Sequence, residues 1–202
     1  MVRIGVCALQ GAFAEHVEVL RRLSSNRYEV CEVRIASDLA AIDALIIPGG
    51  ESTSMRVIGD SSGFLTALKQ FVSSGRPCWG TCAGCILLSD RIVSTSNSVT
   101  SASLIGGVDV TSSRNFFGRQ LQSFQTLTEG RGSFDKFPAI FIRAPAIIEI
   151  GPLAEKLASI TYNESQLVVA ARQNRLLVTC FHPELTQDDR IHEYFVEQIV
   201  LS

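Results

Sequence analysis

The sequence has little charge, and this shortage excludes whole classes of protein. Only 19% of its 202 residues are charged, against about 25% in an average soluble domain, while 46% are hydrophobic. A chain this apolar can bury a large core, so intrinsic disorder is excluded. The 20 acidic and 18 basic residues give a net charge of −2, with no basic stripe, which makes nucleic acid a poor partner.

Long apolar runs are missing too. Mean hydropathy is +0.23, yet the hydrophobic runs are short pieces such as 44–48, far below the roughly 20 residues that a membrane helix needs. Residues 1–9 contain a hydrophobic stretch too short for a secretory signal, so we expect a first strand there. The six cysteines need no disulfide pairing in a chain of this length. We therefore expect reduced thiols, a cytoplasmic location and no contact with a membrane.

Hydrophobic periodicity predicts an α/β fold. In the first half, short β-branched runs alternate with helical patterns, which is typical of βαβ units and a parallel sheet. The predicted strands there are 2–9, 28–35, 44–47 and 78–80, and the predicted helices are 12–23 and 61–74. The second half predicts antiparallel strands over 120–126, 139–143, 146–150 and 166–180, a final helix over 188–200 and an exposed loop over 94–103. We expect one domain over 1–202, a three-layer sandwich with a central mixed, mostly parallel sheet, which binds ligands at the carboxyl ends of its strands.

The segment Gly80-Thr81-Cys82-Ala83-Gly84 is the sharpest local signal. It places a nucleophile with glycine two positions away on either side, after a predicted strand and before a helical run. This spacing is typical of a nucleophile elbow, in which a tight turn lifts the side chain above the sheet edge. A helix N-terminus beneath Cys82 also favours its thiolate. Alone, the motif is equally compatible with a small buried cysteine.

A base for this thiol must come from one of only three histidines. His16 and His192 fall within predicted helices, where we expect them at the surface. His182 follows the apolar strand 175–180, so it occupies a strand's carboxyl end as Cys82 does. Pro183 fixes the backbone between His182 and Glu184, whose carboxylate can reach back to the imidazole. Alternatively, His182 is a polar loop residue and Glu184 a solvated charge, but the three together are more specific.

Acyl transfer also needs donors for an oxyanion. The N–H of Ala83 is one candidate, and a glycine amide at Gly49-Gly50, after the third strand, is the second. An ordinary turn would explain a Gly-Gly pair equally well. Cys82 and Cys85 form a CxxC pattern, and Cys78 is close by, so a redox dithiol and a metal site are rival interpretations. Both are weaker, because the chain has no second pair of metal ligands and neither chemistry calls for Gly80 or His182.

Motifs along nearly the whole chain resemble one family. They are Gly5 to Gly11, Pro48-Gly49-Gly50-Glu51-Ser52-Thr53-Ser54, Gly80 to Gly84, Arg114-Asn115-Phe116-Phe117-Gly118-Arg119-Gln120, Phe141-Ile142-Arg143-Ala144-Pro145 and Phe181-His182-Pro183-Glu184-Leu185. In this order they resemble the glutaminase subunit of pyridoxal 5'-phosphate synthase, a class I, triad-type glutamine amidotransferase with a flavodoxin-like fold.

The resemblance implies an activity and a site. Cys82 would attack the side-chain amide of L-glutamine to give a glutamyl thioester and ammonia, with His182 as base and acid and Glu184 as its orienter. Water would then release L-glutamate. The implied oxyanion donors are the backbone amides of Gly50 and Ala83, and the implied substrate-binding residues are Gly50, Glu51, Ser52, Arg114, Ile142 and Arg143.

The resemblance also implies a partner. Family members pass ammonia to a separate synthase subunit, a (β/α)8 barrel that makes pyridoxal 5'-phosphate for vitamin B6 biosynthesis, and glutaminase activity is expected to be weak until the subunits dock. A barrel takes about 250 residues, so it is expected on another polypeptide. No metal or bound cofactor is expected in the glutaminase.

Two segments depart from the family pattern. Ser123-Phe124-Gln125 stands where the family has Ser-Phe-Glu, which removes a carboxylate, and the Ser-rich stretch 94–103 differs from a tight loop. Other readings stay open: a glutaminase or cysteine hydrolase of another complex, or a noncatalytic scaffold of the same fold that keeps a reactive thiol.

Overall fold

A twelve-stranded sheet forms the centre of the protein in the computed structural model, which describes residues 1–50, 63–93, 99–100, 105–114, 116–118 and 123–202. Its main path runs β2-β1-β3-β4-β14-β13-β11-β7-β5-β6; off this path, β12 pairs with β13, and β9 pairs with β12. A second sheet pairs β10 with β8. The strands are β1 (Val2–Cys7), β2 (Tyr28–Val33), β3 (Ala44–Ile47), β4 (Cys78–Thr81), β5 (Ser89–Val93), β6 (Val99–Thr100), β7 (Val108–Ser113), β8 (Ser123–Leu127), β9 (Glu129–Gly130), β10 (Pro138–Ile142), β11 (Ala146–Ile150), β12 (Glu155–Tyr162), β13 (Ser165–Gln173) and β14 (Leu176–Thr179).

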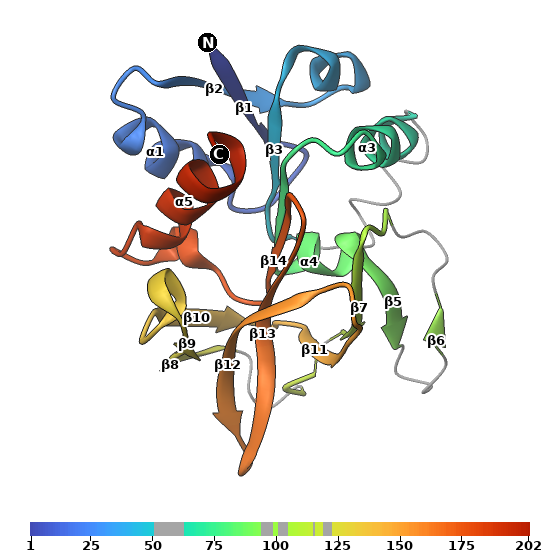
Figure 1. Ribbon diagram of the computed structural model, residues 1–202, viewed down its shortest axis with the longest axis vertical. Helices are drawn as coiled ribbons and strands as arrows, with labels where there is room; N and C mark the ends of the chain where they lie inside the picture. The colour runs from blue at the N-terminus through green and yellow to red at the C-terminus, as the bar shows by residue number, and fades with distance from the viewer. Residues whose placement is uncertain (51–62, 94–98, 101–104, 115, 119–122) are drawn as a thin grey trace.

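Helices cover both faces of this sheet (Figure 1). α1 (Phe13–Leu23) and α5 (Arg190–Phe195) pack together on one face, and α3 (Phe64–Ser73) and α4 (Ala83–Leu88) lie on the other. A π-helical turn over Val196–Val200 continues α5, and 3-10 turns occupy Ala36–Ala41, Gly132–Phe134 and Pro183–Leu185. Within the described residues, no helix is long and apolar enough to span a membrane.

Within the run β2-β1-β3-β4-β14, every pair of adjacent strands is parallel. The next strand, β13, pairs with β14 in the antiparallel sense. Beyond β13 the sheet is mostly antiparallel, with β5 and β7 a parallel pair. The predicted α/β class with a mixed, mostly parallel central sheet is therefore confirmed in the half that carries the predicted chemistry. β3, β4 and β14 are adjacent, so their carboxyl ends meet at one edge.

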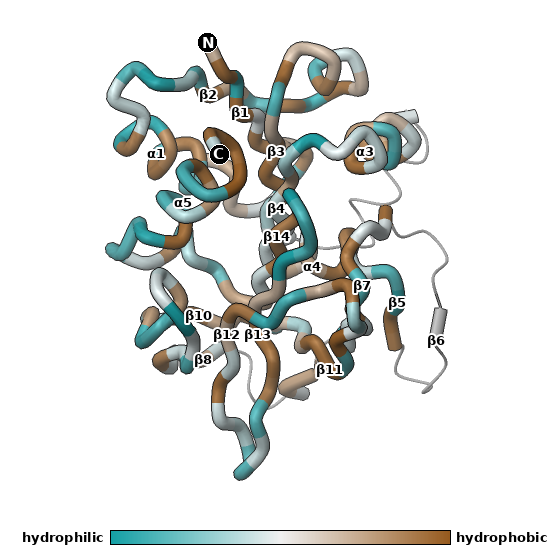
Figure 2. The backbone as a smooth tube through the Cα atoms, viewed as in Figure 1, coloured by the Kyte–Doolittle hydropathy of each residue, from teal (hydrophilic) through white to brown (hydrophobic). Residues whose placement is uncertain are grey.

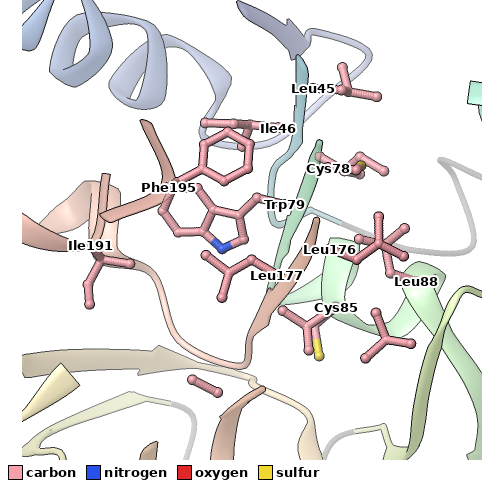
Figure 3. Close-up of a cluster of buried hydrophobic side chains, with 14 of the residues drawn as sticks. Leu45, Ile46, Cys78, Trp79, Cys85, Leu88, Leu176, Leu177, Ile191 and Phe195 are labelled. Carbon is pink, nitrogen blue, oxygen red and sulfur yellow. The ribbon is translucent and has the colours of Figure 1, made fainter. Parts of the chain in front are cut away.

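The core lies on both sides of these parallel strands, because successive side chains of a strand point to opposite faces. Figure 3 shows Ile46, Trp79 and Phe195 on one side of the strands and Leu45 and Cys78 on the other. All of them are fully buried. Hydrophilic residues gather instead at connections such as the turn between α1 and β2 and the tip of the β12–β13 hairpin (Figure 2).

The sequence prediction failed mainly in the second half. The run 166–180 is two strands, β13 and β14, joined at Asn174-Arg175, and β14 turns back to pair in parallel with β4. β5, β7 and β12 were not predicted, since they mix charged and hydroxyl residues with apolar ones and show no clear alternation. Of the predicted loop over 94–103, residues 99–100 form β6, and the remainder lies outside the described residues.

Candidate active site

Cys82 occupies the turn between β4 and α4 in a backbone conformation that L-residues rarely adopt. Its φ is 49° and its ψ −105°, and such strained positions are typical of a nucleophile at the top of a strand. The flanking glycines explain how the turn fits. A Cβ at Gly80 would collide with the carbonyl of Gly84, and a Cβ at Gly84 would collide with the carbonyl of Ile47 in β3. The predicted elbow is therefore present in the structure.

His182 lies beside Cys82 because their strands are neighbours. Thr179 of β14 is in register with Thr81 of β4, and the Cys82 N–H donates a 2.8 Å hydrogen bond to the Thr179 carbonyl. The N–H of His182 donates to the carbonyl of Ile140 in β10 at 2.8 Å, which fixes the backbone of the loop. A Cβ built on Gly49 would touch both the His182 ring and the Cβ of Cys82, so the two side chains lie next to each other. The sheet thus joins two residues that lie 100 positions apart along the chain.

Glu184 completes the cluster from the 3-10 turn that Pro183 begins. Its Oε1 is 2.7 Å from Nδ1 of His182, a short, charge-assisted distance. Because a carboxylate only accepts hydrogen bonds, Nδ1 carries the proton and Nε2 is left to face the Cys82 thiol. Cys82 and His182 are 7% and 8% exposed, whereas the side chain of Glu184 is fully buried. The thiol and the imidazole therefore keep a small contact with solvent, whereas the carboxylate has none.

The charges of the cluster stabilise one another. Burial lowers the pKa of His182, but its hydrogen bonds to Cys82 and Glu184 outweigh burial and raise that pKa from 6.5 to about 10. Burial likewise raises the pKa of Glu184, and the neighbouring His16 and His182 more than offset it, so the net shift is downward. The arrangement favours an imidazolium that lies between the Cys82 sulfur and an ionised Glu184 carboxylate. Such a pair can attack an electrophilic carbonyl and then deliver a proton to the leaving group.

Two backbone amides near Cys82 are the candidates for binding an oxyanion. Ala83 begins α4, and N–H groups in the first turn of a helix have no acceptor within the helix. Gly49 and Gly50 follow β3 at the same edge, and Gly49 is so close that a Cβ there would collide with the His182 ring. The N–H of Gly49 already donates to Thr81 Oγ1 at 3.0 Å, so the exposed Gly50 is the member of the pair left to face a substrate.

The segment around Gln10 and Gly11 supports this glycine loop. Gly11 has a φ of +86°, and a Cβ there would collide with the carbonyl of Gly49. A Cβ on Gly50 would come within 3.3 Å of the side chain of Gln10. The Leu9-Gln10-Gly11 motif at the end of β1 therefore holds the loop after β3 by close backbone approach.

The remaining predicted substrate-binding residues divide into three groups. The carbonyl of Ile142, at the end of β10, lies 4.0 Å from Cys82 Sγ, and the exposed Arg143 follows it with a φ of 46°. Arg114 is half-buried and directly follows β7. The last residue of β7, Ser113, pairs with Ala146, the first residue of β11, and Arg143 comes shortly before Ala146 in the chain. Arg114 and Arg143 therefore lie at the same end of the β7–β11 pair. Glu51 and Ser52 lie outside the described residues.

The prediction that His16 and His192 are surface residues is wrong. Both are fully buried, with Nδ1 of His16 2.8 Å from Nε2 of His192 and Nε2 of His16 3.3 Å from Oε2 of Glu184. The helical periodicity could have located them. His16 shares the apolar face of Val17 and Leu20, and His192 shares that of Phe195, Val196 and Ile199.

The rival thiol interpretations find little support in the geometry. All six cysteines are free, and burial raises the pKa of Cys7, Cys78 and Cys180, which keeps these thiols neutral. Cys85 is fully buried as a member of the hydrophobic cluster of Figure 3. Among the described residues, no group of three or more potential ligands is arranged to hold a metal ion.

Gln125 is exposed on β8, where it pairs with Ile140 of β10. It lines an open surface cavity of about 750 Å³ together with residues that precede or begin α5, among them Asp188, Asp189 and Glu193. The departure from the family pattern at this position therefore changes a surface cavity and leaves the catalytic cluster intact.

The elbow predicts the effect of Gly84→Ala. A Cβ at this position collides with a carbonyl of the central sheet, so we expect unfolding free energy to fall by about 1–3 kcal/mol and alkylation of Cys82 by iodoacetamide to slow. Denaturant unfolding and alkylation kinetics measure the two effects. Gly75→Ala is the matched control, since Gly75 has a φ of +76° in open space, and it should lose stability without altering alkylation. Unchanged alkylation in Gly84→Ala would contradict the assigned turn.

The electrostatics predict a shift in the titration of His182. The Cys82 side chain contributes to the raised pKa, so Cys82→Ala should lower the pKa of His182 from about 10, with Glu184 still holding it up. Nitrogen-detected NMR titration of the histidine rings measures this directly. Cys31→Ala, which removes a thiol from β2, should leave the pKa of His182 unchanged. An equal pKa in wild type and Cys82→Ala would rule out the thiol–imidazole pair.

Comparison with known proteins agrees with this geometry. Residues 6–201 match the SNO glutamine amidotransferase family. A probable pyridoxal 5'-phosphate synthase subunit PDX2 of Arabidopsis thaliana is 41% identical over 220 residues, covering 96% of this chain and 84% of the relative. The pyridoxal 5'-phosphate synthase subunit PdxT of Anoxybacillus flavithermus is 44% identical, covering 98% and 97%. A crystal structure of a glutamine amidotransferase, 39% identical, superposes with a TM-score of 0.83 over 96% of this chain and 97% of that one. The chain belongs to the SNO glutamine amidotransferase family.

Proposed function

We propose that this chain is the glutaminase subunit of a pyridoxal 5'-phosphate synthase, which hydrolyses L-glutamine and supplies the ammonia to a separate synthase subunit. The observation that carries the proposal is the match, over nearly the full length, to relatives named as subunits of that synthase. The Cys82, His182 and Glu184 cluster adds the chemistry that amide hydrolysis needs. The partner is expected to be a (β/α)8 barrel on another polypeptide.

The first half of the reaction is thioester formation. The Cys82 thiolate attacks the side-chain carbonyl carbon of glutamine, and the carbonyl π electrons move onto oxygen to give a tetrahedral oxyanion. The amides of Ala83 and Gly50 donate to that oxygen. The imidazolium of His182 then gives its Nε2 proton to the departing nitrogen, the C–N bond breaks, and ammonia leaves a glutamyl thioester on Cys82.

The second half returns the enzyme to its starting state. His182, now neutral, takes a proton from water, and the hydroxide formed attacks the thioester carbonyl. Collapse of this second oxyanion breaks the C–S bond and releases glutamate, and the thiolate and imidazolium are restored. Throughout, Glu184 keeps the imidazole oriented and stabilises its positive charge, because its carboxylate is fixed 2.7 Å from Nδ1.

Recognition of the amino acid end of glutamine is assigned to residues at the opening of the site. An arginine can pair bidentately with the substrate carboxylate and a glutamate with its ammonium group. The position of the Ile142 carbonyl, 4.0 Å from Sγ, supports contact of this segment with a bound substrate. The proposed substrate-binding residues are Gly50, Glu51, Ser52, Arg114, Ile142 and Arg143.

The whole chain acts as one unit in this proposal. Strands from both ends of the sequence lie in the same sheet, which supports a single glutaminase domain over 1–202. A thiol nucleophile must stay reduced to work, which favours the cytoplasm as its location. Every step above uses side chains and backbone of this chain, and none calls for a metal or cofactor.

Glutamate release from glutamine tests the proposal. We expect little activity from the chain alone, a marked rise on addition of a pyridoxal 5'-phosphate synthase barrel subunit, and none from Cys82→Ala under either condition. His182→Asn should be inactive as well, because it removes the base, whereas Cys31→Ala should behave as wild type. Cys82→Ala should still bind the partner, since Cys82 is a small side chain at the site opening.

Each alternative gives a different result in the same assay. Full activity without a partner would indicate a free-standing amidase. Hydrolysis stimulated only by a different synthase would indicate another biosynthetic complex. No glutamate from any preparation would favour a noncatalytic, thiol-bearing scaffold and overturn the proposal.

A further inference from the structure

A buried chain of polar groups continues behind the triad carboxylate. His16 of α1 has Nε2 3.3 Å from Oε2 of Glu184, and its Nδ1 is 2.8 Å from Nε2 of His192 in α5. The side chains of His16 and Glu184 are fully buried, and both histidine rings pack against Trp79, with centroids 5.6 and 4.9 Å from the indole. The carboxylate is therefore placed between two imidazoles, His182 on the side of the thiol and His16 on the side of the core.

The acceptor character of Glu184 fixes the direction of every hydrogen in this chain. A carboxylate cannot donate, so the Nε2 of His16 that faces it carries the proton. Nδ1 of a neutral His16 is then an acceptor, and His192 donates to it from Nε2. Nδ1 of His192, which is buried with no hydrogen-bond partner in the described part of the chain, is left unprotonated. This is the less costly arrangement, because buried N–H groups without an acceptor are rare.

The electrostatics agree with this assignment. Burial lowers the pKa of His16, with Glu184 acting in the opposite direction, and burial lowers the pKa of His192 well below its ordinary value. Both rings are therefore neutral near pH 7, so each provides one donor and one acceptor. In its protonated form His16 also lowers the pKa of Glu184 through its charge.

The same imidazole also reaches the loop that carries the proposed oxyanion donor. Nε2 of His16 is 3.4 Å from Oγ1 of Thr81, and Thr81 accepts the hydrogen bond from the Gly49 N–H at 3.0 Å. Gly49 in turn lies against the His182 ring and precedes Gly50. His16 thus contacts the groups that hold two separate parts of the site, the triad carboxylate and the glycine loop.

We propose that His16, oriented by His192, is a positioning residue of the active site: its Nε2–H holds the Glu184 carboxylate ionised and directed at His182. The reaction it serves is the proposed glutamine hydrolysis. Oε2 of Glu184 is buried and has no hydrogen-bond partner among the described residues, and the 3.3 Å contact with Nε2 of His16 does not itself meet hydrogen-bond geometry. His16 is nevertheless the polar group nearest to this oxygen in the polar chain, so a small rotation of the ring would satisfy it. A purely structural role does not explain a histidine here, since an apolar side chain would pack against Trp79 without the cost of burying polar nitrogens.

Two substitutions separate positioning from packing. His16→Leu removes the donor and keeps an apolar side chain, whereas His16→Gln keeps one donor and one acceptor, as neutral histidine has. The groups that act on this cluster are Cys82, His182, Glu184 and His192, with Glu15 and Arg22 of α1 acting at longer range. None of these others changes in either variant.

The decisive readout is the pH dependence of Cys82 alkylation by iodoacetamide, which needs neither glutamine nor a partner. Without the His16 donor the Glu184 carboxylate supports the imidazolium of His182 less well, so the pKa of His182 falls. The neutral thiol–imidazole pair then gains over the thiolate–imidazolium pair, and the thiolate that reacts with iodoacetamide forms only at a higher pH. We expect the acid limb of the alkylation profile to move upward by about one pH unit in His16→Leu and to stay near the wild-type position in His16→Gln.

Steady-state kinetics with the synthase partner give a second readout. We expect kcat for glutamine to fall about 10- to 100-fold in His16→Leu, with KM changed little, and most of kcat to return in His16→Gln. If the chain hydrolyses no glutamine under any condition, the proposed function fails, yet the alkylation profile still tests the role of His16.

Tyr28→Phe is the matched control for lost stability. It removes the buried 2.8 Å hydrogen bond from the Tyr28 hydroxyl to the carbonyl of Leu20 in α1, the helix that carries His16. Because this change leaves the polar chain intact, the acid limb of its alkylation profile should be that of wild type. If His16→Leu fails to fold, His16→Asn replaces it, because the shorter amide does not reach Glu184 and should give the same upward shift. Two results would overturn the proposal. One is an alkylation profile whose acid limb does not move in a folded His16→Leu or His16→Asn variant, and the other is an acid limb that moves equally far in His16→Gln.

Discussion

The fully buried carboxylate of Glu184 is the interaction on which the rest of the site depends. An ionised carboxylate in a protein interior is costly unless hydrogen bonds and opposite charge surround it. Here His182 approaches one oxygen at 2.7 Å and His16 faces the other at 3.3 Å. Burial lowers the pKa of His182, but its interactions with Cys82 and Glu184 together raise that pKa to about 10, so the imidazole is protonated beside the Cys82 side chain. The reactivity of the nearly buried Cys82 sulfur therefore depends on a carboxylate that no solvent reaches.

Parallel pairing of β3, β4 and β14 brings these parts together. Each of the three strands ends at the same edge, and each delivers one component: Gly49-Gly50, Cys82 and His182. The fit is close enough that side chains are excluded at Gly49, Gly80 and Gly84, where a Cβ would strike the His182 ring or a backbone carbonyl. α1 and α5, on the opposite face from α4, supply the two histidines behind the carboxylate. The site thus uses both helical layers of the fold.

The periodicity of hydrophobic residues was enough to predict the strands β1 to β4 and the helices α1 and α3. Short motifs were enough to predict the elbow at Cys82 and the pairing of His182 with Glu184, since each of these features depends on residues that are close together in the sequence. Burial of His16 and His192 was missed because histidine was weighed as a polar residue, although both share apolar helix faces with residues such as Val17 and Phe195. β12 and the division of 166–180 into two strands were missed because their pairing is set by distant partners in the sheet. Contacts such as Ile142 with Cys82 depend on chain reversals that no local period encodes.

Formation of a glutamyl thioester on Cys82 is the central claim of this account, and intact-mass spectrometry of the acid-quenched complex with its synthase partner tests it most directly. During turnover of glutamine, the account predicts wild-type protein that carries one glutamyl group, removed by hydroxylamine and located on the peptide containing Cys82. Cys82→Ala, treated alike, should stay unmodified. Glutamate production with no adduct at any quench time, or an adduct that persists in Cys82→Ala, would contradict the account.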